Sequence, residues 1–555
     1  GGLPCESREL PGTQPRKPAH PAGFFLPYAN RQPISTNNIP CPVPPSALSS
    51  SLFTYASTSM KRLFDVTALI AGALYACAFA PLGLGYFAVL GLSLLFMLLV
   101  RSSPVQGLKY GFLFGLASFG IGVSWVFISL YQFGQIGAVT SVLLTLLFVC
   151  FWAIFPCLMG YCSVKLMQSV KSRRVQLLVI PLLWVIIEYI RGYWVLNGFP
   201  WLQTGYSQLE TPLSGYLPII GGYGVSFLLA FTAMAINLIY EGHYRKTLGC
   251  IVILIWLVGA GCSQIAWTSP RAQAIKVTLV QGNISQDQKW RPENKYKTLK
   301  FYQEATQAHW DSQVIVWPET AIPALFSEVR DSFLVPLNNE AKLHNADIII
   351  SVPMQAADED KFYNTLLTLG KRQGLYKKAH LLPFGEYLPF QPILSVILDR
   401  ISLKLGNFLP GENNQPSLQA GGYWFTPSIC YEDAFSEISL KGLAESSYLV
   451  NVTNDAWFGD SFEPEQHLEI ARMRALESGR YMLRATNTGI TAIISPTGKV
   501  LKQAPIFKPW VLSGEIVPMQ GLTPYAKLGG DPPIIYTLIT LLAMVIARAG
   551  WQRLN

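Results

Sequence analysis

Residues 424–433 read WFTPSICYED, an apolar run that ends in one cysteine and three polar residues. The run is typical of a buried strand, and the polar residues after Cys430 indicate a turn at its end. A thiol at such a strand-to-turn elbow stands clear of the sheet and can meet a substrate. A turn or helix N-terminus there would lower the pKa of the thiol and offer a backbone N–H to an oxyanion. Cys430 is therefore a candidate nucleophile.

Two further segments of the polar region offer chemical partners for this thiol. Residues 314–319 read VIVWPE, an apolar strand that ends in Glu319. Residues 376–386 read YKKAHLLPFGE and place two lysines before a proline–phenylalanine–glycine turn. A base that deprotonates a thiol and a cation that holds an oxyanion are the parts of covalent acyl transfer. The residues alone do not choose between Lys377 and Lys378 as the cation.

The composition outside this region is that of a membrane protein. Hydrophobic residues make up 50% of the 555 positions, only 14% are charged, and the mean hydropathy is +0.31. Several apolar runs approach the ~20 residues that a helix needs to cross a bilayer. These runs cover residues 63–80, 84–100, 108–131, 138–166, 175–195, 215–240, 247–267 and 532–549. We expect a multi-span α-helical membrane domain of about eight transmembrane helices.

Basic residues in the loops between these runs predict the orientation of the chain. They gather before the first run, after the second, fourth and sixth, and after the last: Lys61, Arg62, Arg101, Lys109, Lys171, Arg173, Arg174, Arg245, Lys246, Arg548 and Arg553. If the spans alternate, all of these lie on one side, which the positive-inside rule assigns to the cytoplasm. The net charge of +9 is explained in this way, and nucleic acid is not an expected partner.

The sequence predicts four regions. Residues 1–59, rich in Pro, Ser, Gly and Asn, are expected to be a disordered leader that precedes a natural start at Met60. A membrane domain with seven spans follows at 60–271. A periplasmic α/β domain is expected at 272–520, and a C-terminal transmembrane helix and cytoplasmic tail at 521–555.

Short runs of strand-forming residues alternate with helical periods in the polar region. The expected strands are 276–281, 314–317, 347–352, 363–369, 422–426, 448–452, 491–495 and 511–516, and the expected helices are 292–307, 333–344 and 464–478. The nine cysteines show no paired spacing, and no metal-ligand or phosphate-loop pattern is present. We therefore expect no disulfide framework, no metal and no cofactor.

The motifs around Glu319, Lys378 and Cys430 resemble those of a known superfamily. Residues 317–319 (WPE), the segment from Lys378 to Glu386 and residues 430–432 (CYE) are similar to the Glu-Lys-Cys triad motifs of the nitrilase, or carbon–nitrogen hydrolase, superfamily. With seven spans before the polar domain and one after it, the chain from Met60 onward resembles the family of apolipoprotein N-acyltransferases. The resemblance implies a nitrilase-like αββα sandwich for the polar domain, and it selects Lys378 as the triad lysine.

The resemblance also implies an activity. Glu319 would take the proton of Cys430, whose thiolate would attack the ester of a phospholipid, typically phosphatidylethanolamine, while Lys378 stabilises the oxyanion. The acyl chain would then pass from the Cys430 thioester to the N-terminal amine of diacylglyceryl-cysteine on an apolipoprotein. This ping-pong reaction completes bacterial lipoprotein maturation and needs no cofactor. The partners are therefore the phospholipid donor, the diacylated apolipoprotein and membrane lipids, and we expect a monomer in the inner membrane.

Supporting positions follow from the same resemblance. Glu386, Tyr431 and Glu432 are expected to support the triad. Three tryptophans fit loops that contact substrate, although interfacial anchoring is the alternative for such residues; they are Trp201, Trp290 and Trp457. Glu188 and Arg191, three residues apart in the fifth run, are expected to form an ion pair, because charges inside a membrane are costly unless paired.

Other functions remain open on the sequence, including that of a relative that glycosylates polyprenyl carriers or acylates other amines. A membrane-tethered amidase or nitrilase could use the same triad on a small amide. A transport or scaffold protein could bind lipid without catalysis, in which case Cys430 would be dispensable. An acyltransferase must also keep water from its thioester, and the loops 353–362 and 385–410 are the candidate lid segments.

Overall fold

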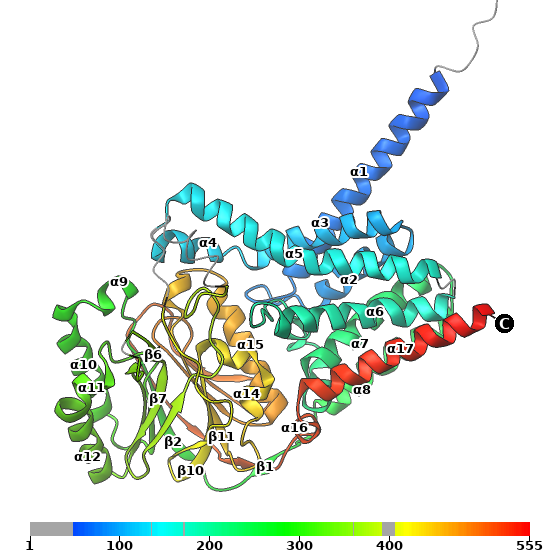
Figure 1. Ribbon diagram of the computed structural model, residues 1–555. Helices are drawn as coiled ribbons and strands as arrows, with labels where there is room; N and C mark the ends of the chain where they lie inside the picture. The colour runs from blue at the N-terminus through cyan, green and yellow to red at the C-terminus, as the bar shows by residue number, and fades with distance from the viewer. Residues whose placement is uncertain (1–47, 135, 170–171, 359, 391–405, 555) are drawn as a thin grey trace, which may run out of the picture. The chain divides into compact units, whose positions relative to one another are not determined.

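The computed structural model describes residues 48–134, 136–169, 172–358, 360–390 and 406–554 (Figure 1). Residues 59–555 form one compact unit. The first helix, α1 (Leu48–Ala76), already runs through positions 48–59, for which the sequence predicted disorder. The remainder of the predicted leader, residues 1–47, lies outside the described residues.

Apolar helices form the first half of this unit and its last element. After α1 they are α2 (Tyr86–Val100), α3 (Pro104–Gly122), α4 (Val126–Ile128), η1 (Ser129–Phe133), α5 (Ala138–Ser169), α6 (Arg173–Tyr189), η2 (Ile190–Trp194), α7 (Leu217–Tyr240), α8 (Arg245–Cys262) and α17 (Asp531–Leu554). Two short turns, η3 (Tyr206–Gln208) and η4 (Pro212–Tyr216), precede α7.

Five of these helices are long and apolar enough to cross a membrane. They cover residues 138–168, 173–194, 212–240, 245–262 and 531–548, and the pair Pro104–Gly122 and Val126–Phe133, bent by 60°, makes a sixth if it is one span. Helix α2 has only 15 residues, fewer than the ~20 that cross a bilayer, and the stretch of α1 from Lys61 onward carries several charges. The predicted number of about eight spans is therefore not confirmed.

Basic side chains meet at one end of the helical region. Arg101 and Arg173 both pair with Glu241 at 3.5 Å, and the guanidinium of Arg174 lies 5.6 Å from the centre of the Tyr244 ring. The loops after α2, before α6 and between α7 and α8 thus lie together, as spans that alternate in direction require.

Two six-stranded sheets form the polar domain. The first has the order β15-β2-β3-β4-β7-β8, with bounds Trp510–Ile516, Ile275–Gln281, Val314–Val316, Asp347–Ser351, Thr365–Leu369 and Gly374–Lys377. The second has the order β14-β13-β12-β11-β10-β9, with bounds Val500–Gln503, Ala492–Ile494, Met482–Thr486, Tyr448–Thr453, Tyr423–Ile429 and Leu418–Ala420. The strands β2, β3 and β4 are parallel, as are β10, β11 and β12.

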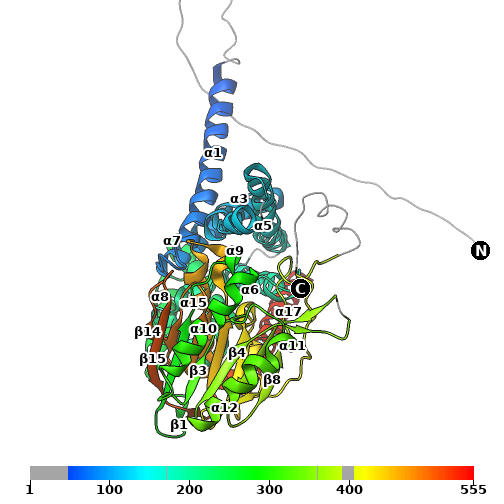
Figure 2. The ribbon, with the colours of Figure 1, turned by 90° about the vertical axis from the view of Figure 1, so that its left-hand side faces the viewer.

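Helices cover the outer face of each sheet. In Figures 1 and 2, α10 (Pro292–Gln307) and α12 (Val335–Leu343) lie against the first sheet, and Figure 1 shows α14 (Ser436–Leu440) and α15 (Glu463–Ser478) against the second. Buried aliphatic side chains from both sheets, such as Val316 and Val450, share one core between them. The predicted αββα sandwich is therefore confirmed.

Helix α15 joins the polar domain to the apolar helices. The indole of Trp125 donates a hydrogen bond to Oε1 of Gln466 at 3.1 Å, and Nε2 of Gln466 donates to the carbonyl of Gly122 at 2.9 Å. Figure 1 shows α15 between the sheets and the apolar helices. The bend between α3 and α4 therefore rests on the same helix that backs the second sheet.

Candidate active site

Cys430 stands at a strand-to-turn elbow, as the sequence predicted. Strand β10 ends at Ile429, and Cys430 opens the short turn η7 (Cys430–Ala434). The backbone φ of Cys430 is +52°, in the left-handed region that residues with a side chain seldom adopt. Such strain costs about 1–3 kcal/mol and persists only where surrounding contacts impose it, which is common at functional sites.

The carboxylate of Glu432 holds this elbow against the segment after β8. Its Oε1 accepts hydrogen bonds from the Tyr376 hydroxyl at 2.8 Å and from the Ala379 N–H at 2.7 Å. Its Oε2 accepts from the N–H of Ile429 at 2.8 Å. Glu432 therefore fixes the position of Cys430 relative to Lys378, which lies between Tyr376 and Ala379 in the chain.

Lys378, and not its neighbour, is the buried lysine. Only 1% of Lys378 is exposed, and its Nζ lies 2.9 Å from Oε2 of Glu386 and 3.9 Å from Oε1 of Glu319. These carboxylates outweigh burial and raise the pKa of Lys378, so the ammonium stays charged. Lys377 instead places its Nζ over the ring of Tyr363, 4.1 Å from the centre. The alternation of side chains along β8 separates the two lysines.

Glu319 lies just after β3 and is buried beside Lys378. Its Oε1 accepts a hydrogen bond of 2.7 Å from Nδ2 of Asn364, which also donates to Glu386 at 3.3 Å. A second buried lysine, Lys289, donates to the backbone carbonyl of Glu319 at 3.4 Å. Burial raises the pKa of Glu319 above its usual 4.5, although Lys378 opposes this. A carboxylate with a raised pKa is better suited to accept a proton near neutral pH.

The thiol of Cys430 is protonated at rest. Burial and the nearby Glu319 raise its pKa to about 12, and Lys378 acts in the opposite direction without cancelling the rise. The expectation that the turn lowers this pKa is therefore wrong, because burial outweighs the turn. A thiol of this kind reacts only when a base removes its proton during the attack. The position of Glu319 permits it to act as this base.

A loop from the apolar region packs against the residue after the nucleophile. The ring of Trp201 stacks on that of Tyr431, with centroids 5.7 Å apart and planes 10° from parallel. The hydroxyl of Tyr431 donates to the carbonyl of Gly198 in the same loop. Trp201 is buried, so its place is between the two regions of the chain rather than at an exposed membrane boundary.

Glu188 and Arg191 hold this loop in place. Among the described residues they form no ion pair with each other, contrary to the sequence-based expectation. Instead, Nη1 of Arg191 donates to the carbonyls of Phe199 at 2.7 Å and Trp201 at 2.6 Å. Oε1 of Glu188 accepts from the N–H of Thr204 at 2.8 Å. Arg191 and one carboxylate oxygen of Glu188 thus bind the loop that carries Trp201, whereas Oε2 of Glu188 is buried without a hydrogen-bond partner.

The other two tryptophans are on exposed turns. Trp290 follows the short helix α9 (Gln286–Lys289) and is 54% exposed. Trp457, in the turn η8 (Asp455–Phe458), is 45% exposed and meets the ring of Phe133 edge-on at 5.9 Å. Their proposed contact with substrate stays a prediction. Of the candidate lid segments, residues 391–405 lie outside the described residues.

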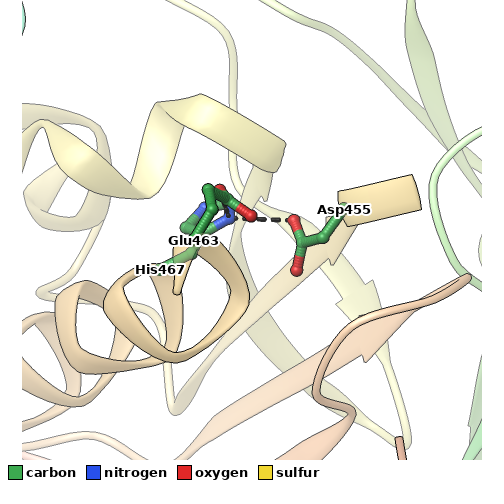
Figure 3. A group of neighbouring side chains, drawn as sticks. All are labelled: Asp455, Glu463 and His467. Carbon is green, nitrogen blue, oxygen red and sulfur yellow. Dashed lines mark hydrogen bonds and ion pairs between the residues drawn. The ribbon is translucent and has the colours of Figure 1, made fainter. Parts of the chain in front are cut away.

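Sequence reasoning missed a buried ionic cluster next to the elbow. Side chains of Asp455, Glu463 and His467, on η8 and α15, point toward one another (Figure 3). Their ligand atoms lie within 4.8 Å of one another, a spacing that could hold a metal ion. However, the Nη2 of Arg484 already donates to the second oxygen of Asp455 at 3.1 Å. The only sequence signal was the spacing of Glu463 and His467 by one helical turn.

Both halves of the chain match families of known proteins. Residues 71–235 match the family model "Apolipoprotein N-acyltransferase N-terminal domain", and residues 276–523 match the model "Carbon-nitrogen hydrolase". Proteins named apolipoprotein N-acyltransferase from Methylococcus capsulatus and Coxiella burnetii are 48% and 39% identical. These alignments cover 87% and 86% of this chain and 95% and 100% of the relatives. Among solved structures, Saccharomyces cerevisiae Nit3, of the nitrilase superfamily, is 18% identical with a TM-score of 0.34, covering 49% of this chain and 94% of that one.

Proposed function

Because the chain belongs to the family of apolipoprotein N-acyltransferases, in the nitrilase superfamily, we propose that it acylates lipoproteins. The acyl chain comes from a phospholipid, typically phosphatidylethanolamine, and goes to the N-terminal amine of diacylglyceryl-cysteine. The observation that carries the proposal is the buried meeting of Glu319 and Lys378 beside the Cys430 elbow. A thiol, a base and a fixed cation are what covalent acyl transfer requires.

The first half-reaction forms a thioester. Glu319 takes the proton of the Cys430 thiol as sulfur attacks the sn-1 ester carbonyl of the phospholipid. Lys378 stabilises the oxyanion of the tetrahedral intermediate, for which its permanent charge is suited. The carbon–oxygen bond then breaks, and the lysophospholipid alkoxide leaves with the proton that Glu319 returns to it.

The second half-reaction consumes the thioester. The free α-amine of the diacylated apolipoprotein attacks the thioester carbonyl, and Glu319 removes a proton from that amine. The carbon–sulfur bond breaks and Glu319 returns the proton to the leaving thiolate, so the products are an amide and the regenerated Cys430 thiol. No oxidant, reductant or metal is needed, because the thioester conserves the energy of the ester until the amine arrives.

The membrane arrangement supports the same function. Both lipid substrates lie in a membrane, and five or six of the described helices are long and apolar enough to cross one. The basic end marked by Arg101, Arg173 and Arg174 lies where α2 ends and α6 begins, whereas the other end of α6 leads through η2 into the loop whose Trp201 packs on Tyr431 of the polar domain. By the positive-inside rule, we place that end in the cytoplasm of a bacterial inner membrane and the polar domain in the periplasm.

A transfer assay tests the function. Purified full-length protein in detergent is given phosphatidylethanolamine with a labelled sn-1 chain and a synthetic peptide that begins with diacylglyceryl-cysteine. We expect the label to move to the peptide amine with the wild type, and no transfer with Cys430→Ala. Cys250→Ala is a matched control, because Cys250 is an exposed thiol on α8 and should leave transfer unchanged.

The competing activity has its own readout in the same preparation. An amidase that uses this triad would release ammonia from a small amide without any lipid, and the peptide would stay unlabelled. Hydrolysis of the amide without acyl transfer would overturn the proposed function. Transfer that persists in Cys430→Ala would overturn the thioester mechanism and keep the acyltransferase.

A further inference from the structure

Five ionisable side chains that the proposed mechanism does not use lie between the nucleophile elbow and helix α15. They are Asp433, Asp455, Glu463, His467 and Arg484, and each is at most 1% exposed. Charges that are shielded from water in this way are costly unless they neutralise one another. The geometry of the cluster therefore indicates which of its members are charged.

Both ring nitrogens of His467 face carboxylate oxygens. Nε2 lies 2.9 Å from Oδ1 of Asp433, and Nδ1 lies 3.0 Å from Oδ1 of Asp455. A neutral imidazole donates from one nitrogen only, whereas an imidazolium donates from both. The ring between these two carboxylates is therefore the doubly protonated form. Glu463, whose Oε1 is 3.4 Å from Nδ1, lies on the same side as Asp455 (Figure 3).

Arg484 completes the charge balance. Its Nη1 and Nη2 each lie 3.1 Å from the second oxygen of Asp433 and Asp455 respectively. Two carboxylates thus face two cations, and the net charge of the cluster is zero when Glu463 carries a proton. Burial and the neighbouring Asp455 raise the pKa of Glu463 to about 7, in the direction that this balance requires. No further cation is needed for neutrality.

The cluster contacts the turn that begins at the nucleophile and, through Asn451, the backbone carbonyl of Cys430. Asp433 belongs to the turn η7 that Cys430 opens. Nη1 of Arg484 donates to Oδ1 of Asn451 at 2.7 Å, and Nδ2 of that Asn451 donates to the carbonyl of Cys430 at 3.3 Å. These contacts can hold Cys430 in its left-handed conformation. The positive charge of His467 also acts on the thiol, whose pKa it lowers against the effect of burial.

We propose that His467 is a permanently protonated positioning residue, which with Arg484 fixes the elbow and places a positive charge behind Cys430. The charge favours the thiolate that forms when the base removes the proton. The groups that face the imidazolium are Asp433, Asp455 and Glu463, with Arg484 beyond the two aspartates and the Trp201 ring 5.8 Å away. The inference rests on the proposed function only in taking Cys430 as the nucleophile.

A bound metal ion is the physical alternative at this position. The ion would have to replace the proton on Nδ1 of His467, since a protonated nitrogen has no lone pair to offer. It would also add at least two positive charges next to Arg484, where the positive and negative charges of the cluster already cancel. We therefore expect purified wild-type protein to contain far less than one equivalent of any transition metal by elemental mass spectrometry. One equivalent in the wild type that is lost in His467→Gln would overturn the proposal.

Alkylation of the thiol tests the charge directly. Full-length protein in detergent is treated with iodoacetamide from about pH 6 to about pH 10, and the modified Cys430 peptide is quantified by mass spectrometry. In His467→Gln the neutral amide cannot donate from both ends. We expect its alkylation to be about tenfold slower near pH 8, equivalent to a rise of about one unit in the thiol pKa. In the transfer assay, kcat should fall while KM for the phospholipid stays unchanged.

The matched control is His344→Gln, which removes an exposed imidazole that stacks on Trp310 at the end of α12. It should alkylate like the wild type. A folded His467→Gln protein whose alkylation profile equals that of the wild type would contradict the proposal. Because alkylation needs no lipid, a slower rate in a protein that transfers no acyl chain would keep this inference and reject the proposed function.

A measurement on the wild type decides the matter if His467→Gln fails to fold. A histidine that is charged throughout this range adds no step to the reactivity of the thiol near pH 6.5, the ordinary imidazole pKa. Glu463, whose pKa is about 7, titrates in the same region, so the wild type is compared with Glu463→Gln. A smooth rise in alkylation is the expected result in Glu463→Gln. A step near pH 6.5 that remains in Glu463→Gln would mean that His467 loses its proton there and would overturn the proposal.

Discussion

Two buried ionic clusters lie beside Cys430, and they differ in charge balance. In the first, the ammonium of Lys378 faces two carboxylates, those of Glu319 and Glu386, while the second buried lysine, Lys289, contacts only the backbone carbonyl of Glu319. In the second, with Glu463 protonated, Arg484 and His467 face two aspartates, so that each aspartate contacts two cations. Both clusters are hidden from water, and both exert their charge on the same thiol.

The difference indicates which cluster can move a proton. A carboxylate that shares one cation with a second carboxylate gains stability when it accepts a proton, because the remaining pair is then balanced. A carboxylate that already contacts two cations does not gain stability when it accepts a proton. The Glu319 cluster is therefore suited to chemistry, and the His467 cluster is suited to holding the elbow still.

The largest effect is expected from Glu319→Gln. The amide keeps the shape of the side chain but accepts no proton, so we expect kcat to fall by about a thousandfold. Acyl transfer from labelled phosphatidylethanolamine measures the change. Glu304→Gln, on the exposed face of α10, is the control and should transfer normally. A Glu319→Gln enzyme that keeps a tenth of wild-type activity would remove this residue from the role of base.

Glu386→Gln should have a smaller effect. Its carboxylate contacts Nζ of Lys378 at 2.9 Å and accepts from the N–H of Leu382 at 2.8 Å, but it is not proposed to exchange a proton with substrate. Loss of a hydrogen bond between charged groups costs about 1.5–3 kcal/mol, so kcat should fall by about 10- to 100-fold. A loss as large as that of Glu319→Gln would mean that the two carboxylates act as one unit.

The pH dependence of kcat/KM tests the same cluster without a substitution. Glu319 must be ionised to act, and burial raises its pKa above 4.5, so activity should fall as the pH drops through a midpoint above that value. Below the midpoint the loss is about tenfold for each pH unit. The raised pKa of Lys378 means that this ammonium adds no alkaline loss below 10.5. An acid midpoint at or below 4.5 would contradict the assignment of the base.

Arg191→Gln tests the loop that packs on the elbow. The substitution removes the charged donor to the carbonyls of Phe199 and Trp201, so the contact between Trp201 and Tyr431 should loosen. We expect kcat to fall about tenfold, the effect of about 1.4 kcal/mol of lost positioning. Arg101→Gln, at the other end of the helices, should have no effect. Equal activities of the two variants would show that the loop does not position the elbow.

The smallest effect concerns stability. The pKa of His467 is raised in the folded protein, so its contribution to stability is complete below about pH 6.5 and is lost as the pH rises toward the folded pKa. His467→Gln should therefore lower the melting temperature most near pH 6, and the deficit should shrink by a few degrees toward pH 9. Thermal unfolding in detergent measures this. A deficit that grows with pH would mean that the histidine is neutral in the folded state.

The sequence predicted the elements that bring the triad together. Strands β3 and β10 are short apolar runs that change abruptly to polar residues, and helix α10 was predicted with its observed bounds. Strand β12 was missed because Arg484 interrupts its apolar pattern, and that arginine is buried only because two aspartates neutralise it. Strands β8, β9 and β14 were missed as short edge strands, in which few residues pack on a core.

The second cluster could not be predicted for a similar reason. Its members come from the turns η7 and η8, helix α15 and strand β12, so no single segment shows the pattern. The expected ion pair of Glu188 and Arg191 was wrong because spacing along a helix cannot reveal the loop that binds both. Likewise, residues alone did not separate Lys378 from Lys377, since the choice depends on the alternation of β8.

The acylated state of Cys430 is the central claim, and intact-mass analysis tests it most directly. Wild-type protein and Cys430→Ala are incubated with phosphatidylethanolamine in the absence of any acceptor, and their masses are measured before and after hydroxylamine. The account predicts that the wild type gains the mass of one acyl chain, that hydroxylamine removes it, and that Cys430→Ala gains nothing. No adduct on a wild-type preparation that still cleaves a small amide would contradict the account.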